Sequence, residues 1–484
     1  MILSKEQINR YLRHIIIPEI SGQGQKKLLE FSVLVYGETV EEISPMIYYL
    51  SATGIGNIIC HLHNVQGFES LISNIKDYNP DISLKLNDEN ELNNDEVKFR
   101  IFFGNINYIT NFKKNVSVKN NIFIPSIISV YNEWDSIIAY FDNEISLNHF
   151  INNLSNEYTN LNNINKYNCG YIISYSILGT LCAIECFKKC LQIGQIQNDN
   201  LYLDLFSMEF NKIEQNNLES FIKKLCTVNY ENINNNHIKE VMSQSKVLII
   251  GAGGLGSPAA YNLALAGVGT IGLIDNDKVE LSNLNRQIIH SVSRIGMPKV
   301  ESAKIFLKNI NPDLNVITYM DYFNLENAVE IIKDYDIVIS AVDNIQTRYL
   351  LNDACILANK PLVEAGVLKF NGTNTTIIPN EGHCYRCLFP NLGAGSGASC
   401  SETGVLGPVP GIMGFIQSAE VIKIIAKIGI TLKNKILMFD AIDFDFMNVN
   451  LEKNPNCPVC GKNPSITTLQ TYDLTCKTKE DNKI

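Results

Sequence analysis

The sequence has no excess of basic residues. It holds 40 Lys and Arg against 50 Asp and Glu, which gives a formal net charge of −10 at pH 7. No stretch resembles a Lys/Arg stripe that could neutralise the phosphates of DNA or RNA. This composition argues against a general nucleic-acid binder, so the expected partners are small ligands or proteins.

Long hydrophobic runs are also missing. A membrane helix needs about 20 consecutive apolar residues, and the nearest run, YIISYSILGTLCAIECF at residues 171–187, contains Ser, Thr and Glu. We expect a buried helix there and no membrane association. The first residues, MILSKEQINRYLRHIIIPE, place charges among the apolar side chains, which predicts no signal peptide. The expected compartment is therefore the cytoplasm.

Hydrophobic residues make up 45% of the 484 and charged residues 19%, which is typical of a globular chain of two or three domains. Short β-branched runs alternate with helix-like segments in two copies. Four pairs of segments recur in the same order: 31–37 with 245–251, 50–60 with 263–273, 182–194 with 418–429, and 200–210 with 435–446. The sequence predicts an α/β fold of two tandem Rossmann-like, doubly wound sheets. We expect domains at 1–215 and 241–465, a linker at 216–240 and a polar tail at 466–484.

The second copy carries a glycine-rich loop, GAGGLG at 251–256, directly after an apolar run. Its glycines Gly251, Gly253, Gly254 and Gly256 would let the chain turn sharply and bring backbone N–H groups against an anion at a helix N-terminus. Asp275 ends the next apolar run, where a carboxylate suits ribose hydroxyls. The pattern predicts nucleotide binding, and a purely structural tight turn is the alternative.

The first copy differs where this chemistry would lie. It has GETVEE at 37–42 in place of the glycines, and Leu62 and His63 stand near the position of the ribose carboxylate. Carboxylates at 41 and 42 would repel a triphosphate. The first copy is therefore predicted to have lost nucleotide binding.

Polar residues downstream of Asp275 favour a triphosphate over a dinucleotide. LSNLNRQ supplies Asn283 and Arg286, and GMPKVESA supplies Lys299 at a predicted helix start. Two cations suit the charge of a triphosphate during transfer, although surface charges are often only solvated. Asp343 in ISAVDN ends another apolar run at the edge where α/β sheets bind ligands, and could hold Mg²⁺.

Two cysteine pairs predict a metal site. Cys384 and Cys387 form one C-x-x-C pair, and Cys457 and Cys460 form the other. Four thiolates in a tetrahedral array are typical of structural Zn²⁺, whereas a redox disulfide within one pair is the alternative. Other cysteines among the 13, such as those at 182, 186 and 190, are interpreted as core thiols.

Together these motifs resemble the MoeB/ThiF and ubiquitin-activating family of adenylating enzymes. The motifs that carry the resemblance are GAGGLGS, DNDKVELSNLNRQ, GMPKVESA, INP, SAVDN, CYRC and CPVCG. The resemblance implies that the glycine loop and Arg286 hold ATP and that Asp275 binds the ribose. It also implies that Lys299 and Asp343 serve the phosphates and Mg²⁺.

Two further residues take expected roles from this resemblance. Cys400 lies in the Gly/Ser-rich segment GAGSGASCSETGVLGP, where a family cysteine can take part in sulfur or thioester transfer, and an inert loop cysteine is the alternative. The segment RYLRHIIIPE at 10–19 is similar to the family's N-terminal motif, so the first copy is a degenerate domain of the same type. In homodimeric members an arginine at the position of Arg13 reaches the ATP of the other protomer.

The expected function is ATP-dependent adenylation of the C-terminal Gly-Gly carboxylate of a small ubiquitin-fold sulfur carrier. It would use ATP, Mg²⁺ and a structural Zn²⁺. One chain would then be a fused pseudo-dimer with a single active site, although the first half could instead only bury the dimer face of the second. Two alternatives stay open: adenylation of a ribosomal peptide in natural-product maturation, and a nicotinamide (NAD)-dependent oxidoreductase.

Overall fold

Two eight-stranded sheets with the same strand order make up the framework of the protein. The computed structural model describes residues 2–87, 97–112, 123–158, 168–194, 200–214, 217–230, 232–390 and 403–470. The sheet orders are β3-β2-β1-β4-β5-β6-β7-β8 and β11-β10-β9-β12-β13-β14-β15-β16. In each sheet the first five strands of this order pair in parallel, and the remaining pairs are antiparallel. The predicted tandem α/β architecture is confirmed.

The first half contains the sheet from β1 to β8 and the helices that cover it. Its strands are β1 (Ser32–Thr39), β2 (Asn57–Asn64), β3 (Ser83–Leu86), β4 (Phe99–Asn105), β5 (Ser126–Asn132), β6 (Asp135–Phe141), β7 (Asn200–Asp204) and β8 (Glu209–Ile213). Its helices are α1 (Lys5–Arg10), α2 (Leu12–Ile15), α3 (Ser21–Leu29), α4 (Val40–Thr53), α5 (Phe68–Tyr78), α6 (Ile106–Asn111), α7 (Glu144–Glu157), α8 (Cys169–Leu191) and α9 (Leu218–Thr227).

The second half repeats this order. Its strands are β9 (Lys246–Ile250), β10 (Thr270–Ile274), β11 (Asn315–Tyr319), β12 (Ile337–Ser340), β13 (Leu362–Leu368), β14 (Asn371–Ile377), β15 (Lys435–Asp440) and β16 (Asp445–Asn450). Its helices are α10 (Asn235–Gln244), α11 (Gly256–Leu265), α12 (Lys299–Ile310), α13 (Ala328–Ile332), α14 (Ile345–Leu357), α15 (Tyr385–Leu388) and α17 (Pro408–Ala426), with short 3₁₀ turns η1 (Leu281–Asn283) and η2 (Val292–Arg294). The stretch 216–240, expected as a linker, includes α9 and the start of α10.

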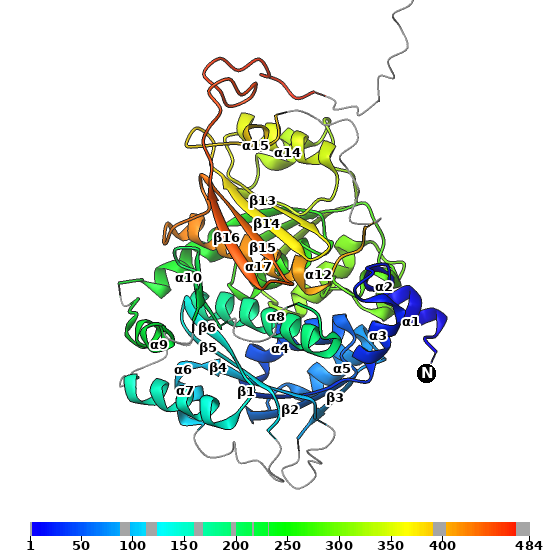
Figure 1. The fold of residues 1–484 in the computed structure, drawn as a ribbon. Helices are drawn as coiled ribbons and strands as arrows, with labels where there is room; N and C mark the ends of the chain where they lie inside the picture. The colour runs from blue at the N-terminus through cyan, green and yellow to red at the C-terminus, as the bar shows by residue number, and fades with distance from the viewer. Residues whose placement is uncertain are drawn as a thin grey trace, which may run out of the picture.

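Helices α4, α8 and α17 lie between the two sheets, so the two halves share one core (Figure 1). Helices α8 and α17 are long and apolar enough to cross a membrane, yet 94% and 89% of their most apolar windows are buried inside the protein. The buried helix expected at 171–187 is confirmed. Apolar residues all around these helices are what a position between two sheets requires.

The two core helices carry equivalent buried ion pairs. Glu185 pairs with Lys188 on α8 at 2.8 Å, and Glu420 pairs with Lys423 on α17 at 2.7 Å. Each lysine also reaches the opposite half, because Lys188 lies over the ring of Phe444 and Lys423 donates to a main-chain carbonyl of the first half. The halves therefore contact each other in a reciprocal way, as the two subunits of a twofold dimer do.

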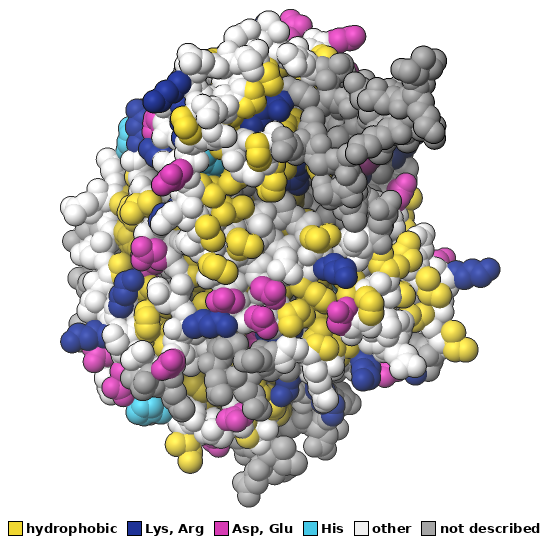
Figure 2. Space-filling model, turned by 45° about the horizontal axis from the view of Figure 1, so that its top comes forward, with side chains coloured by type: hydrophobic (Ala, Val, Ile, Leu, Met, Phe, Trp, Pro, Cys, Tyr) yellow, Lys and Arg dark blue, Asp and Glu magenta, His cyan; other side chains and the backbone are white. Residues whose placement is uncertain are grey.

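Charged side chains of both signs are mixed on the surface. On the face seen in Figure 2, Lys and Arg side chains lie scattered among Asp and Glu side chains and hydrophobic residues. This distribution agrees with the absence of a basic stripe in the sequence.

Candidate active site

The glycine loop joins β9 to α11 at the carboxyl edge of the second sheet. Gly251 has φ of +100°, and a Cβ there would lie 2.6 Å from the Ala341 oxygen. A Cβ on Gly256 would lie 1.9 Å from the Gly251 oxygen. Both positions thus need glycine for the loop itself to form.

Gly253 and Gly254 are glycines for a different reason. Within the described chain, a Cβ on Gly253 would meet only Gln287, at an ordinary contact distance of 3.5 Å from its Nε2, and one on Gly254 would lie 3.3 Å from Pro410. Protein packing alone does not demand glycine at 253. The loop leaves a cradle there at the N-terminal end of α11, which fits the close approach of a phosphate group.

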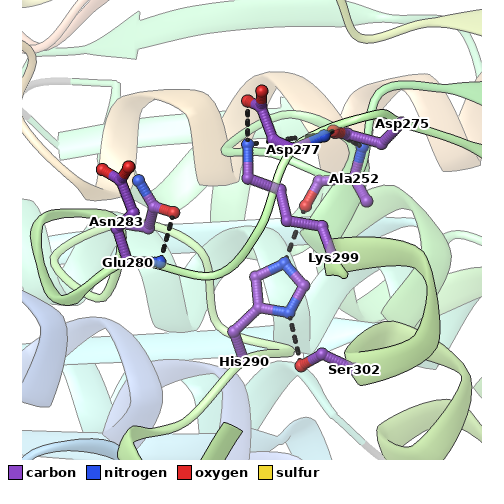
Figure 3. A network of polar contacts seen from close by, with 8 residues as sticks. All are labelled: Ala252, Asp275, Asp277, Glu280, Asn283, His290, Lys299 and Ser302. Carbon is purple, nitrogen blue, oxygen red and sulfur yellow. Dashed lines mark hydrogen bonds and ion pairs between the residues drawn. The ribbon is translucent and has the colours of Figure 1, made fainter. Parts of the chain in front are cut away.

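Asp275 and Lys299 lie beside this loop (Figure 3). Asp275 follows β10, and its two carboxylate oxygens accept hydrogen bonds from the backbone N–H groups of Ala252 and Asp277, each at 2.8 Å. Lys299 starts α12, with its Nζ 2.7 Å from Asp277 Oδ2 and 4.0 Å from Asp275 Oδ2. Burial raises the pKa of Asp275, and the Lys299 charge opposes that rise. The predicted ribose carboxylate and phosphate lysine therefore lie close together.

His290 anchors the glycine loop and was not expected from the sequence. Its Nε2 lies 2.9 Å from the Ala252 carbonyl oxygen, and its Nδ1 lies 2.9 Å from the Ser302 hydroxyl (Figure 3). A carbonyl only accepts, so Nε2 carries the proton and Nδ1 accepts from Ser302. Burial lowers the pKa of His290 to about 3, so the ring is neutral. No motif surrounds this single histidine, and only the fold reveals its contact with the loop.

Arg286 borders the same loop, whereas Asn283 holds a turn. Arg286 Nη1 donates to the Ser282 carbonyl and to Asn285 Oδ1, both at 2.9 Å, and a Cβ on Gly254 would lie 3.5 Å from Arg286 Cδ. The Asn283 amide oxygen accepts from the Glu280 N–H at 3.0 Å, which closes η1. The role of Asn283 toward ATP stays a prediction.

Asp343 is exposed on the segment after β12. Strand β12 pairs in parallel with β9, so the carboxyl ends of both strands meet at the edge that carries the glycine loop. The preceding Val342 carbonyl accepts from Arg348 Nη2 at 2.7 Å, and Arg348 pairs with Glu364. Because Mg²⁺ is usually held by one or two carboxylates together with substrate phosphates, a single carboxylate at this edge fits the ion.

The N-terminal helices of the first half lie against this site. Helix α1 contacts η1, and Figure 1 shows α1 and α2 beside the second half. The Arg13 carbonyl accepts from the Val405 N–H at 3.2 Å, and His14 Nε2 accepts from the Gly407 N–H at 3.0 Å. The half-buried Arg13 is thus placed next to the second half, although its role toward ATP stays a prediction.

The four predicted zinc ligands come together in space. The Sγ atoms of Cys384, Cys387, Cys457 and Cys460 all lie within 4.8 Å of one another. Cys384 Sγ is 3.5 Å from Cys457 Sγ, and Cys387 Sγ is 3.4 Å from Cys460 Sγ, so the four are free thiols. Sulfur atoms converging in this way fit one tetrahedral Zn²⁺ with no open position. Cys400 lies outside the described residues.

The corresponding edge of the first half has the opposite chemistry. A cavity of about 400 Å³ there is lined by Glu38, His61, His63 and aromatic residues. Glu42, in the first turn of α4, has its pKa raised to about 8 by burial and by the nearby Glu38 charge. Glu42 is therefore largely protonated at neutral pH, and the negative charge that an anion would meet in this cavity comes from Glu38. The loss of nucleotide binding in the first half stays a prediction.

Comparison with known proteins matches the second half. The ThiF family profile matches residues 226–459. The adenylyltransferase and sulfurtransferase MOCS3 of Aedes aegypti is 43% identical over 244 residues, covering 50% of this chain and 56% of the relative. That of Drosophila persimilis is 44% identical over 248 residues, covering 50% and 55%. The chain spans about half the length of the curated relatives it matches.

Two solved structures are similar in part. Selenomethionine-labelled PaaA is 24% identical, with a TM-score of 0.41, covering 50% of this chain and 72% of that one. E. coli MccB with MccA is 20% identical, with a TM-score of 0.43, covering 69% and 97%. The profile match covers the glycine loop, Asp275, Arg286, Lys299 and three of the four clustered cysteines, Cys384, Cys387 and Cys457. Residues 226–459 of the chain thus match the ThiF family, and about half of the chain is similar in sequence to the curated MOCS3 relatives.

Proposed function

We propose that the chain adenylates the C-terminal carboxylate of a ubiquitin-like sulfur carrier, using ATP bound at the glycine loop of the second half. One observation carries this proposal: the open space at Gly253 lies at the same sheet edge as the largely buried side chains of Asp275 and Lys299. The relatives at 43–44% identity are named adenylyltransferases and sulfurtransferases, which supports the same chemistry here.

Different residues of the site would bind the phosphates, the ribose and Mg²⁺ of the ATP complex. The N-terminal end of α11 and the N–H groups of the loop face the phosphates, and Asp275 is held by two N–H groups in position for the ribose hydroxyls. Arg286 and Lys299 are already fixed by hydrogen bonds, so they can oppose phosphate charge without reorganising. Mg²⁺ at Asp343 would add positive charge against the β- and γ-phosphates.

The reaction needs no general base in this proposal. A C-terminal carboxylate is ionised at pH 7, so it can attack the α-phosphorus directly. The new bond joins the carboxylate oxygen to the α-phosphorus while the bond to the bridging oxygen breaks, which releases pyrophosphate and leaves an acyl-AMP. Positioning of the two reactants and neutralisation of charge would supply most of the acceleration.

A groove beside Asp343 suits the approach of an extended tail. It has a volume of about 370 Å³ and is lined by residues of α14, β13, β14 and the α15 region, including Arg348, Thr373 and Phe389. Arg348 connects the groove to the Asp343 segment through its bond to the Val342 carbonyl. We propose that the carrier's C-terminal residues lie in this groove with the carboxylate directed toward the glycine loop.

We further propose that one chain works as a fused pseudo-dimer. The reciprocal packing of α8 and α17, and the placement of α1 and α2 against η1, support a role for the first half at the second half's site. Arg13 is the residue expected to reach the nucleotide. The first half would thus have kept this arginine after losing its own nucleotide site.

ATP–pyrophosphate exchange with a panel of ubiquitin-fold carriers and short peptides tests the proposal. Each substrate is supplied with and without its terminal carboxylate, and Arg286→Ala is compared with Lys333→Ala, an exposed control on α13's end. We expect exchange that requires a Gly-Gly carboxylate, is lost in Arg286→Ala and persists in Lys333→Ala. Exchange only with peptides lacking Gly-Gly would move the function to peptide maturation, and NADH binding without any exchange would favour an oxidoreductase.

A further inference from the structure

His14 lies fully buried where the first half meets the second. Its Nε2 is 3.0 Å from the backbone nitrogen of Gly407, the residue that precedes α17. A backbone N–H can only donate, so Nε2 must be the acceptor of this bond. The tautomer follows: the proton of the neutral ring is on Nδ1.

The other side of the ring is fixed as well. His14 Nδ1 lies 3.2 Å from Gln25 Oε1, and Gln25 Nε2 donates to the Thr53 carbonyl at 2.9 Å. The bonds therefore run in one direction, from Gly407 through the imidazole and the amide to the end of α4. Gln25 on α3 and Thr53 on α4 thus orient His14 within the first half, and the Gly407 N–H is its hydrogen-bond partner in the second half.

Gly407 also packs directly against the backbone of Asn285. A Cβ on Gly407 would lie 2.0 Å from the Asn285 carbonyl oxygen, so the two backbones touch. Asn285 Oδ1 in turn accepts from Arg286 Nη1 at 2.9 Å. Only one residue, Gly407, thus separates the histidine of the first half from the asparagine that holds Arg286.

Neighbouring backbone bonds keep the same segment in place. The N–H of Val405 donates to the Arg13 carbonyl, and the N–H of Leu406 donates to the Lys369 carbonyl after β13. With Gly407 on His14, three successive N–H groups have partners, and two of these partners belong to the first half. The first half therefore supplies two of the three contacts that hold this segment against Asn285.

We propose that His14 is a positioning residue for Arg286, acting through Gly407 and Asn285. This inference rests on the proposed function, since Arg286 is assigned there to ATP. It gives the first half a task at the active site that does not depend on Arg13 reaching the nucleotide.

The electrostatics require a neutral ring for this task. Burial lowers the pKa of His14 to about 4, the Gln25 contact opposes the shift, and the Arg286 charge adds to it. An imidazolium would place a second N–H against the Gly407 N–H and a positive charge near Arg286. The ring is therefore a stable acceptor at neutral pH.

The variants His14→Gln and His14→Asn test separately the two hydrogen bonds that the His14 ring makes. In His14→Gln the amide oxygen can occupy the place of Nε2 and accept from Gly407, whereas in His14→Asn the shorter side chain reaches only the place of Nδ1. Both variants are neutral and both remove the ring. We expect His14→Asn to raise the KM for ATP about tenfold, with kcat and the carrier KM changed much less, as for one buried N–H left without an acceptor. His14→Gln should stay within about twofold of the wild type.

A double-mutant cycle shows whether the effect passes through Arg286. The cycle uses the equilibrium dissociation constant of ATP, which can be measured without exchange activity. In the Arg286→Ala background, His14→Asn should change this constant by less than about twofold, because the coupled residue is gone. An equal loss in both backgrounds, or equal losses for His14→Gln and His14→Asn, would overturn the proposal. Thermal unfolding of each full-length variant shows that the protein is folded.

Hydrogen exchange measured by mass spectrometry gives a readout that does not need catalysis. Peptides covering 403–407 and 282–287 should exchange faster in His14→Asn than in His14→Gln or the wild type. Unchanged protection in His14→Asn would refute the positioning role even if the enzyme is active. Absence of wild-type ATP–pyrophosphate exchange would instead refute the proposed function and leave the hydrogen-exchange comparison to decide on His14.

Discussion

Alanine at two glycines of the same loop should have opposite consequences. In Gly256→Ala the new Cβ would lie 1.9 Å from the Gly251 oxygen, far inside the closest C···O contacts of about 3.3 Å. That oxygen belongs to the backbone of the loop, so it can move only if the turn itself moves. In Gly253→Ala the nearest atom, Gln287 Nε2, lies at an ordinary 3.5 Å.

The magnitudes follow from these contacts. Overpacking a rigid neighbour costs about 1–3 kcal/mol, and a backbone clash this close should lie at the upper end. At about 2–4 °C per kcal/mol for a domain of this size, Gly256→Ala should lower the Tm by about 6–12 °C. Gly253→Ala should leave the Tm unchanged or raise it slightly, since Gly253 has no positive φ and alanine restricts the unfolded chain.

Gly253→Ala, the variant with normal stability, should be the one that loses ATP affinity through a direct clash with the phosphate. A methyl group at 253 would enter the space assigned to phosphate, so we expect the KM for ATP to rise at least tenfold in a protein of normal stability. Thermal unfolding and ATP–pyrophosphate exchange on both variants provide the data. Normal ATP affinity in Gly253→Ala would refute the assignment of the cradle, and a Tm loss equal to that of Gly256→Ala would refute the packing argument.

Three other predictions concern separate parts of the molecule. Arg13→Ala should lower the exchange rate at least tenfold, while Lys212→Ala, a surface change in the same half, has no effect. Equal rates in a folded Arg13→Ala protein would refute a role of Arg13 at the nucleotide. The folded pKa of His14, about 4, is below the unfolded value of about 6.5, so folding stability is lost as the pH falls below 6.5. Between pH 6 and pH 5, denaturant titrations should show His14→Gln losing about 1 kcal/mol less stability than the wild type. Metal analysis should find one zinc per chain, absent in Cys457→Ser, and a Tm unchanged by that substitution would contradict a structural metal.

Much of the second half's site could be predicted because its signals are local. The glycine loop, Asp275 and Lys299 lie within residues 251–299, and each follows a strand or starts a helix, as the apolar runs predict. The repeated apolar runs predicted two tandem α/β sheets, and the structure has two sheets of equivalent strand order. The two cysteine pairs could be joined across the chain because four thiolates have few other uses.

Contacts between distant residues could not be predicted in this way. His14 and Gly407 are 393 positions apart, and no sequence pattern around either residue predicts their contact. His290 is a lone histidine whose partners, Ala252 and Ser302, are set by how α12 packs against the loop. The contact of the Asn283 amide oxygen with the Glu280 N–H was also not expected from the sequence, and the role of Asn283 toward ATP stays a prediction.

The central claim is that a carrier carboxylate attacks the α-phosphorus of ATP at the second half's loop. The most direct measurement uses a carrier whose terminal carboxylate is labelled with ¹⁸O, followed by mass spectrometry of the AMP released when the acyl group is transferred. The account predicts one ¹⁸O in the AMP and none in the pyrophosphate. Label in pyrophosphate or in inorganic phosphate, or AMP without label, would contradict it.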